Sequence, residues 1–267
     1  MPELPDLEAI KGFLRPRLVG VAIQEVVTGQ PVVLRQPSVA EFVALLRGNV
    51  FAGVERRGKF LLFPMTSGHV LAINFMLTGR LQYCLPAERR HARTCLELSL
   101  EDGHRLRYFD DHLMGKVYLV EQLDSIPHYQ DMGPEATDEE LTLEVFQKRL
   151  RRHFGQIKNI LVNDTFVTGI GNAYADEILF AAGINPYRSR SRLSPQEVEK
   201  LYQATRRVLA EATETVCQRL GEEIHREIRD FLPVHGKGGQ PCPRCGNTIS
   251  QITAHYRLTN FCRRCQA

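Results

Sequence analysis

The chain has 267 residues, of which 43% are hydrophobic and 24% charged, and its formal net charge is +3. This composition excludes the intrinsically disordered class and predicts one large or two medium globular domains with a hydrophobic core. No stretch approaches the roughly 20 apolar residues of a membrane-spanning helix. The first residues also lack the basic and apolar regions of a signal peptide. We therefore expect a cytoplasmic protein with no membrane partner.

The first half of the chain is predicted to combine one N-terminal helix with many short strands. Residues 2–14 place apolar side chains at helical spacing, and Pro5 falls in the first turn, where proline is tolerated. Further along, short apolar runs are separated by turn signals, with one helix near 39–46. The expected strands are 21–27, 59–63, 69–73, 96–100 and 116–120. This pattern predicts a β-sandwich or flattened barrel.

The second half is predicted to be helical and to end in a small module. The segments with helical spacing are 143–150, 173–182 and 194–217. Ser194 followed by Pro195 and Glu197 is typical of a helix start. The result is an α+β multi-domain chain. Its expected parts are a sandwich at 1–125, a linker at 126–140, a helical domain at 141–232 and a terminal module at 233–267.

Two segments are basic and contain no acid, although the chain as a whole is nearly neutral. The first spans 148–158, and the second spans 231–267. Two such clusters favour a polyanionic partner bound on one surface. The alternative is that they are two solvated faces without a partner.

Four cysteines near the C-terminus form two CxxC pairs. They are Cys242, Cys245, Cys262 and Cys265, with 16 residues between the pairs. This spacing is typical of a four-cysteine zinc ribbon, in which protein ligands fill every position and the zinc is structural. The alternative is a redox pair. The other three cysteines, Cys84, Cys95 and Cys217, are expected to be small buried apolar residues.

The first residues offer an unusual nucleophile. If Met1 is removed, Pro2 carries a secondary α-amine, and α-amines have a pKa of about 8, so a useful fraction is neutral near pH 7. Such an amine can attack C1′ of a deoxyribose and form an iminium ion, while the neighbouring Glu3 moves protons. A retained Met1 would block this chemistry. Proline at position 2 is common, however, and in isolation it more often has no function.

A glycine-rich turn precedes the expected helix near residue 173. Gly169 and Gly171 allow a backbone to come close, and the amides at a helix N-terminus suit a phosphate group. The preceding segment brings Lys158. The turn does not fit a nucleotide-binding loop, because no βαβ unit surrounds it. It fits the turn of a helix-two-turn-helix clamp better.

Taken together in chain order, these segments resemble the formamidopyrimidine-DNA glycosylase/endonuclease VIII family from end to end. The matching segments are 2–5 (PELP), 58–60 (GKF), 78–80 (TGR), 169–177 (GIGNAYADE) and the terminal cysteine hairpin. The resemblance implies a β-sandwich with an N-terminal helix, a helix-two-turn-helix domain and a zinc-ribbon hairpin, with DNA in the cleft between the domains. It also implies base excision repair, by a DNA glycosylase that is also an abasic-site lyase.

The same resemblance implies roles for individual residues. Pro2 would be the Schiff-base nucleophile and Glu3 the acid/base on the sugar. Lys59 would contact phosphate and assist β-elimination. Asn172 and Arg257 would grip the phosphates that flank the flipped nucleotide, and Arg257 would assist δ-elimination.

Other residues lie at positions where members of the family contact DNA. Leu77 lies at the position of the wedge that fills the gap left by a flipped nucleotide, and apolar side chains suit that role. The alternative is that Leu77 is a core strand residue. The full set of expected DNA contacts is Lys59, Asn74, Leu77, His91, His112, Lys158, Asn172 and Arg257.

The segment 110–115 departs from the pattern of members that excise 8-oxoguanine. His112 replaces the arginine that reads the base opposite the lesion, and Met114 replaces the phenylalanine that props the gap. Asp6 stands where many members have Glu. The stretch between Val216 and His235 lacks the long glycine-rich loop that covers a flipped purine. The lesion is therefore open among oxidised pyrimidines, formamidopyrimidines and other damage.

We expect damaged double-stranded DNA as the partner, a monomer, one structural Zn²⁺ and no organic cofactor. The resemblance also implies a bacterial-type, nucleoid-associated protein of the cytoplasm. Two alternatives remain. One is a family member that binds damaged DNA without catalysis, against which the presence of Pro2, Glu3 and Lys59 argues. The other is a generic zinc-ribbon nucleic-acid module on a β-scaffold, which would leave Pro2 and the glycine turn unexplained.

Overall fold

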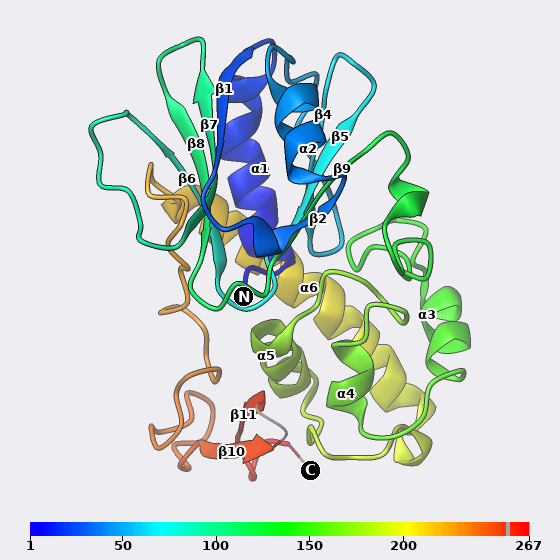
Figure 1. The fold of residues 1–267 in the computed structure, drawn as a ribbon. Helices are drawn as coiled ribbons and strands as arrows, with labels where there is room; N and C mark the ends of the chain where they lie inside the picture. The colour runs from blue at the N-terminus through cyan, green and yellow to red at the C-terminus, as the bar shows by residue number, and fades with distance from the viewer. Residues whose placement is uncertain (255–256, 267) are drawn as a thin grey trace. The chain divides into compact units, whose positions relative to one another are not determined.

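The computed structural model describes residues 1–254 and 257–266, and its contacts divide the chain into two compact units (Figure 1). Unit 1 comprises Met1–Gln130 and Thr215–Ile228, and unit 2 comprises Asp131–Glu214 and Arg229–Ala267. Unit 1 therefore includes a segment that follows most of the helical region in the chain. In the described part of the chain, no helix is long and apolar enough to cross a membrane.

Unit 1 contains two β-sheets. The four-stranded sheet has the order β1 (Ile23–Thr28), β7 (Thr94–Leu100), β8 (Arg105–Asp110) and β6 (Gly79–Cys84). The five-stranded sheet has the order β2 (Leu34–Gln36), β9 (Lys116–Val120), β5 (Val70–Asn74), β4 (Phe60–Pro64) and β3 (Glu55–Arg57). All pairs are antiparallel except β2 with β9. Buried apolar residues of both sheets form one core, as expected for a sandwich.

Two helices contribute to this core. α1 (Leu4–Leu18) buries Leu7, Ile10 and Leu14 in the cluster that contains residues of both sheets. The helix begins two residues later than predicted and continues past residue 14. α2 (Val39–Leu46) has the predicted bounds, because Ser38 and Glu41 form a capping box at its start. A short 3₁₀ turn, η1 (Pro31–Val33), precedes β2.

Unit 2 is helical and ends in a hairpin. Its helices are α3 (Leu143–Leu150), α4 (Ile157–Leu161), α5 (Asn172–Ala182) and most of α6 (Pro195–Arg219). The hairpin pairs β10 (Ser250–Ala254) with β11 (Arg257–Phe261), and the 3₁₀ turn η3 (Arg190–Arg192) precedes α6. Another 3₁₀ turn, η2 (Leu123–Ser125), follows β9 in unit 1. The predicted start of α6 is confirmed, because Ser194 N donates to Glu197 Oε2 at 2.7 Å and Glu197 N donates to Ser194 Oγ at 3.3 Å.

The three cysteines outside the hairpin differ in burial. Cys84 and Cys95 are buried in unit 1, as predicted, whereas Cys217 is exposed. The prediction for Cys217 is wrong because α6 is amphipathic. Val216 occupies the buried face there, so the next residue falls on a face in contact with solvent.

The last two residues of α2 provide a matched test of this core. Leu46 is fully buried, whereas Leu45 is 40% exposed. We expect Leu46→Ala to lower the free energy of unfolding by about 2–5 kcal/mol, because it removes transfer energy and leaves a cavity. Leu45→Ala should change it by less than about 0.5 kcal/mol. Urea unfolding of both variants measures the difference, and equal effects would contradict the assignment of the core.

Candidate active site and nucleic-acid interface

The start of the chain is fixed against unit 1. Pro2 and Glu3 are buried, and Glu3 N donates to Asp6 Oδ2 at 2.8 Å in the first turn of α1. Asp6, which departs from the glutamate of many family members, therefore helps to cap this helix. The N-terminal ammonium group of Met1 donates to Glu227 Oε1 at 2.8 Å. The two residues predicted for catalysis thus lie together at an end of α1 held by packing and by polar contacts.

Two of the predicted phosphate contacts lie at neighbouring strand ends. Lys59 is in the turn between β3 and β4, where Gly58 takes a left-handed conformation with φ 57°. Asn74 ends β5 and pairs with Phe60, the residue after Lys59. The side chains of Lys59 and Asn74 are both partly exposed. The sheet register therefore brings together two residues that are 15 positions apart in the numbering of the chain.

The predicted wedge lies in an exposed turn that Asp110 holds. Leu77, between β5 and β6, is 51% exposed, so the alternative of a core strand residue is excluded. The fully buried Asp110 accepts hydrogen bonds from the Thr78 hydroxyl, from Gly115 N at 2.6 Å and from His112 N at 3.2 Å. One carboxylate thus joins the turn that carries Leu77 to the segment 111–115.

The segment 111–115 is exposed around a tightly packed glycine. The side chains of His112 and Met114 face solvent, and Met114 is 41% exposed. A Cβ added at Gly115 would meet the Tyr108 hydroxyl oxygen at 1.7 Å, so no larger residue fits there without a shift. His112 and Met114 are therefore presented from a rigid base.

His91 belongs to a cluster of rings. It stacks on Phe109 of β8 with the ring centroids 3.8 Å apart, and His225 packs edge-on against both rings. Burial lowers the pKa of His225. The cluster fixes the orientation of His91, and it shows that the segment around residue 225 is packed on the four-stranded sheet of unit 1.

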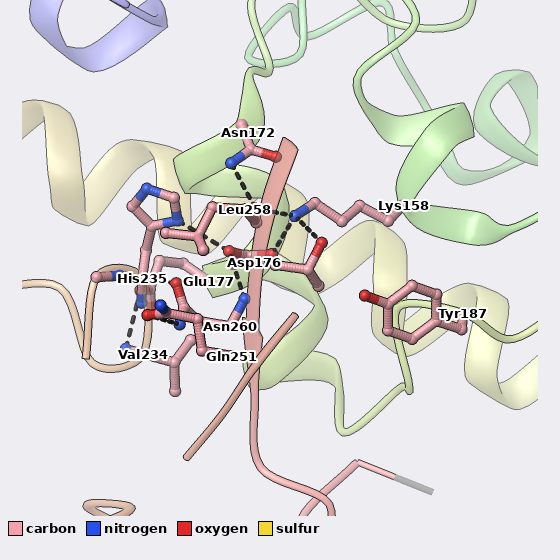
Figure 2. Close-up of polar contacts among 12 residues, drawn as sticks. Lys158, Asn172, Asp176, Glu177, Tyr187, Val234, His235, Gln251, Leu258 and Asn260 are labelled. Atoms are coloured by element: carbon pink, nitrogen blue, oxygen red, sulfur yellow. Dashed lines mark hydrogen bonds and ion pairs between the residues drawn. The ribbon is translucent and has the colours of Figure 1, made fainter. Parts of the chain in front are cut away.

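In unit 2, the glycine-rich turn leads directly into α5. Gly169 has φ 93°, and Gly171 is the N-cap residue of α5. Asn172, the first residue of the helix, donates from Nδ2 to the carbonyl oxygen of Leu258 at 2.7 Å (Figure 2). The helix start and strand β11 are therefore joined by the side chain that is predicted to contact phosphate.

Asp176 is the centre of a buried polar network, shown in Figure 2. Its carboxylate forms an ion pair with Lys158 at 2.6 Å and accepts from His235 Nδ1 at 2.8 Å and from Asn260 N at 3.0 Å. Lys158 Nζ also donates to Thr259 Oγ1 at 2.8 Å and to Leu258 O at 3.0 Å. A buried charge is stable only when it is paired and hydrogen-bonded in this way. In this position Lys158 connects α4, α5 and β11. Its contact with DNA stays a prediction.

Glu177, the residue after Asp176 in α5, is also buried, and its hydrogen-bond donors are backbone N–H groups. Its Oε1 accepts from His235 N at 2.7 Å and from Val234 N at 3.0 Å. Burial is the largest effect and the neighbouring Asp176 carboxylate adds to it, so the pKa of Glu177 rises from 4.5 to about 7. Near neutral pH this carboxyl group is therefore partly protonated.

The four hairpin cysteines form a metal site. Their sulfur atoms all lie within 4.8 Å of one another, with Cys242 Sγ to Cys265 Sγ at 3.8 Å and Cys245 Sγ to Cys262 Sγ at 3.5 Å. A tetrahedron of thiolates about 2.3 Å from a zinc ion has edges of about 3.8 Å. The residues therefore fit one Zn²⁺ with four protein ligands. Such a closed site supports folding of the hairpin and has no open position for catalysis.

The side chain of Arg257 lies outside the described part of the structure, although its backbone begins β11. Sequence reasoning also missed several residues that organise the site, namely Arg80, Asp110, Asp176, Glu177, Glu227 and His235. Arg80, Asp110, Asp176 and Glu177 lie within segments that the sequence comparison had already singled out, and the charge of their side chains was the signal that could have identified them. Glu227 and His235 gave no signal, because their partners are distant in the chain.

Replacing the buried Glu177 tests the raised pKa. Between about pH 4.5 and 7 the folded chain holds a proton that the unfolded chain lacks. The bound proton stabilises the folded chain fully below about pH 4.5, the pKa in the unfolded chain. This stabilisation is lost as pH rises through about 7, the pKa in the folded chain. Glu177→Gln keeps a neutral group, so its stability relative to wild type should increase by about 1–3 kcal/mol between pH 5 and pH 8. Urea unfolding measures this, with exposed Glu199→Gln as the control, and parallel curves for all three proteins would refute the shift.

The metal site predicts one zinc ion per chain. Cys262→Ser removes one of four thiolates, and we expect it to lower the bound zinc well below one per chain and to increase proteolysis within 236–267. Metal analysis with limited proteolysis measures both, and Cys84→Ser is the control because Cys84 is a buried cysteine of unit 1. Unchanged zinc content in Cys262→Ser would contradict the site.

Comparison with known proteins adds to this geometry. Three family models match: the formamidopyrimidine-DNA glycosylase N-terminal domain over residues 1–117, its H2TH domain over 132–221, and a zinc finger found in FPG and IleRS over 239–267. Formamidopyrimidine-DNA glycosylase of Pelotomaculum thermopropionicum is 35% identical, with 100% of this chain and 99% of the relative covered. The enzyme of Symbiobacterium thermophilum is 38% identical, with 100% and 89% covered.

Solved structures agree over the whole chain. Lactococcus lactis Fpg in complex with DNA containing an abasic site has a TM-score of 0.90 and 27% identity, and the same protein with N7-benzyl-Fapy-dG DNA has a TM-score of 0.90 and 28% identity. Both matches cover 99% of each chain. The sandwich, the helical domain, the zinc hairpin and the full-length relatives lead to one conclusion: the chain belongs to the formamidopyrimidine-DNA glycosylase family of DNA-repair enzymes.

Proposed function

We propose that this chain removes a damaged base from double-stranded DNA and then nicks the strand through a Schiff base on Pro2. The observation that carries the proposal is the buried start of the chain, where Pro2 and Glu3 lie together at the capped end of α1. A terminal amine held by the core, next to a carboxyl group, is what an amine nucleophile requires. The names of the relatives, formamidopyrimidine-DNA glycosylases, support the substrate class.

The chemistry begins once Met1 has been removed. The neutral Pro2 nitrogen attacks C1′ of the deoxyribose, and the damaged base leaves with the electron pair of its glycosidic bond and takes up a proton. The nitrogen then loses its proton to water, and Glu3 protonates the sugar ring oxygen as the ring opens, which leaves an iminium ion between Pro2 and C1′. The iminium ion withdraws electrons, so a proton is lost from C2′ and the 3′ phosphate leaves. Lys59 assists this β-elimination, and we assign Arg257 to a subsequent δ-elimination.

The DNA contacts that we propose come from both units. In unit 1, Lys59 and Asn74 offer polar groups for phosphates, Leu77 is exposed as a wedge, and His91 and His112 are held by stacking and by backbone hydrogen bonds. In unit 2, we propose contacts from Lys158, Asn172 and Arg257. For Asn172, a second N–H group on the same nitrogen that binds Leu258 is suited to a phosphate oxygen.

The identity of the damaged base that is removed is a separate proposal. His112 and Met114 stand in the segment that reads the opposite base and props the gap, and both are exposed. A histidine there cannot form the bidentate contact of an arginine. We therefore propose formamidopyrimidines or oxidised pyrimidines, in preference to 8-oxoguanine, as the bases removed.

The damage-binding alternative depends on whether Met1 is removed from the chain. A chain that keeps Met1 has no free proline amine and would act as a damage-binding protein without catalysis. Intact mass of the cellular protein distinguishes the two states.

Borohydride trapping tests the proposed function. The protein without Met1 is incubated with duplexes that carry an abasic site, a formamidopyrimidine, an oxidised pyrimidine or 8-oxoguanine, and is then reduced. We expect a covalent adduct with the abasic duplex, and the ranking of the other duplexes identifies the lesion class. Pro2→Gly should trap poorly, because a primary amine replaces the secondary one, and the stability of this variant is checked by thermal melting.

An exposed residue outside the site serves as the control. Glu199→Gln should trap like wild type, because Glu199 lies on the exposed face of α6. DNA binding without any adduct from wild type would overturn the enzymatic proposal and favour the damage-binding function.

A further inference from the structure

The segment that follows α6 is bound to unit 1 by apolar contacts. Ile224 is 1% exposed and belongs to the core of the sandwich, and Leu220 packs against that core. His225 packs against His91 and Phe109. The backbone directly before Glu227 is therefore anchored on unit 1, which limits the positions that Glu227 can take.

Glu227 binds the N-terminal amine and an arginine at the same oxygen. Its Oε1 accepts from the N-terminal nitrogen at 2.8 Å and from Arg80 Nη2 at 2.8 Å. Arg80 also donates from Nη1 to Gly79 O at 2.7 Å, at the start of β6. The carboxylate is thus held on one side by the four-stranded sheet and faces the start of the chain on the other. Its side chain is 26% exposed, so water reaches the group.

When Met1 is removed, the nitrogen of Pro2 becomes the terminal amine near Glu227. Three covalent bonds separate the nitrogen atoms of residues 1 and 2, so the atoms lie within about 4 Å of each other. The Pro2 nitrogen is therefore near enough to Glu227 for a hydrogen bond after a small movement, or for one bridging water.

Resting on the proposed function, we propose that Glu227 is the catalytic base that takes the proton from the Pro2 ammonium group before the attack on C1′. The protonated amine has no lone pair and cannot react. Transfer of one proton to the Glu227 carboxylate gives the neutral amine and a carboxylic acid, after which nitrogen forms its bond to C1′. Glu227 returns its proton to water, and the secondary amine loses its remaining proton to water as the iminium ion forms.

The other acids near the chain start are less suited to this step. Glu3 is 2% exposed and is assigned to the sugar oxygen, and Asp6 accepts the backbone hydrogen bond that caps α1. The charged groups around Glu227 include the terminal amine, Arg80 from β6, and Arg226 beside it in the chain, which pairs with Glu223. His225, another titratable residue of the segment, has a pKa lowered by burial and packs on rings. Glu227 directly binds the amine.

The test compares Glu227→Gln with wild type. Met1 removal is verified by intact mass for each protein, and single-turnover trapping on an abasic duplex isolates Schiff-base formation from base release. The amide of Gln still accepts from Arg80 but takes no proton. We expect trapping at about pH 6 to slow by at least about tenfold, within the usual contribution of a general base. The loss should shrink at about pH 9, above the usual α-amine pKa of about 8, where the amine is already neutral.

Two further variants separate chemistry from structure. Glu223→Gln removes an exposed carboxylate of the same segment and should trap like wild type at every pH. Glu227→Asp keeps a carboxylate and should retain the wild-type shape of the pH profile at a lower rate, which keeps the proposal testable if Glu227→Gln folds poorly. Binding to an abasic-site analogue should be unchanged in all variants.

The outcomes are distinguishable. If wild type forms the trapped adduct and Glu227→Gln forms it at the same rate at every pH, the proposed role of Glu227 is wrong and the Pro2 mechanism stays intact. A Glu227→Gln defect of equal size at both pH values, with weakened DNA binding, indicates a structural clamp and also overturns it. Wild type that never traps overturns the proposed function itself.

Discussion

The packing of α1 in the sandwich core is the constraint on which the proposed chemistry depends. A chain terminus is ordinarily mobile and a poor place for a catalytic group. Here Leu7, Ile10 and Leu14 are buried with residues of both sheets, and the turn before them is capped by Asp6. The positions of Pro2 and Glu3 are therefore determined by the core of unit 1. Glu227 and Arg80 add polar contacts at the same end.

A comparable constraint operates within unit 2. Asp176 is fully buried and holds α4, the segment at residue 235 and β11 through charged or backbone hydrogen bonds (Figure 2). The zinc site fixes the far ends of the hairpin, whereas this network fixes the hairpin to the helix that follows the glycine turn. Asn172 and Leu258 are joined across the same contact. The residues of unit 2 that we propose as phosphate contacts are thus held in place by a network centred on the Asp176 carboxylate.

Sequence patterns predicted the elements with regular spacing and clear ends, such as α2 and α6, whose capping residues are local. β6 and β8 were missed because polar residues alternate with their apolar ones, namely Arg80 and Gln82 in β6 and Arg105 and Arg107 in β8. Arg107 is 3% exposed in β8, where it pairs with Glu97 at 2.9 Å and donates to the carbonyl oxygens of Glu88 and Pro86, and these contacts make its burial possible. Cysteine spacing predicted the metal site. The contact between Glu227 and the amine joins residues 226 positions apart, which no local pattern records.

The central claim, that the proline nitrogen forms the covalent bond to DNA, is tested most directly by locating that bond. The borohydride-reduced adduct is digested with nuclease and trypsin, and the modified peptide is sequenced by mass spectrometry. The account predicts that the sugar remnant is on the N-terminal peptide that begins at Pro2 and ends at Lys11. A remnant on a peptide that contains Lys59, or an N-terminal peptide that still carries Met1 in a protein that forms adducts, would contradict the account.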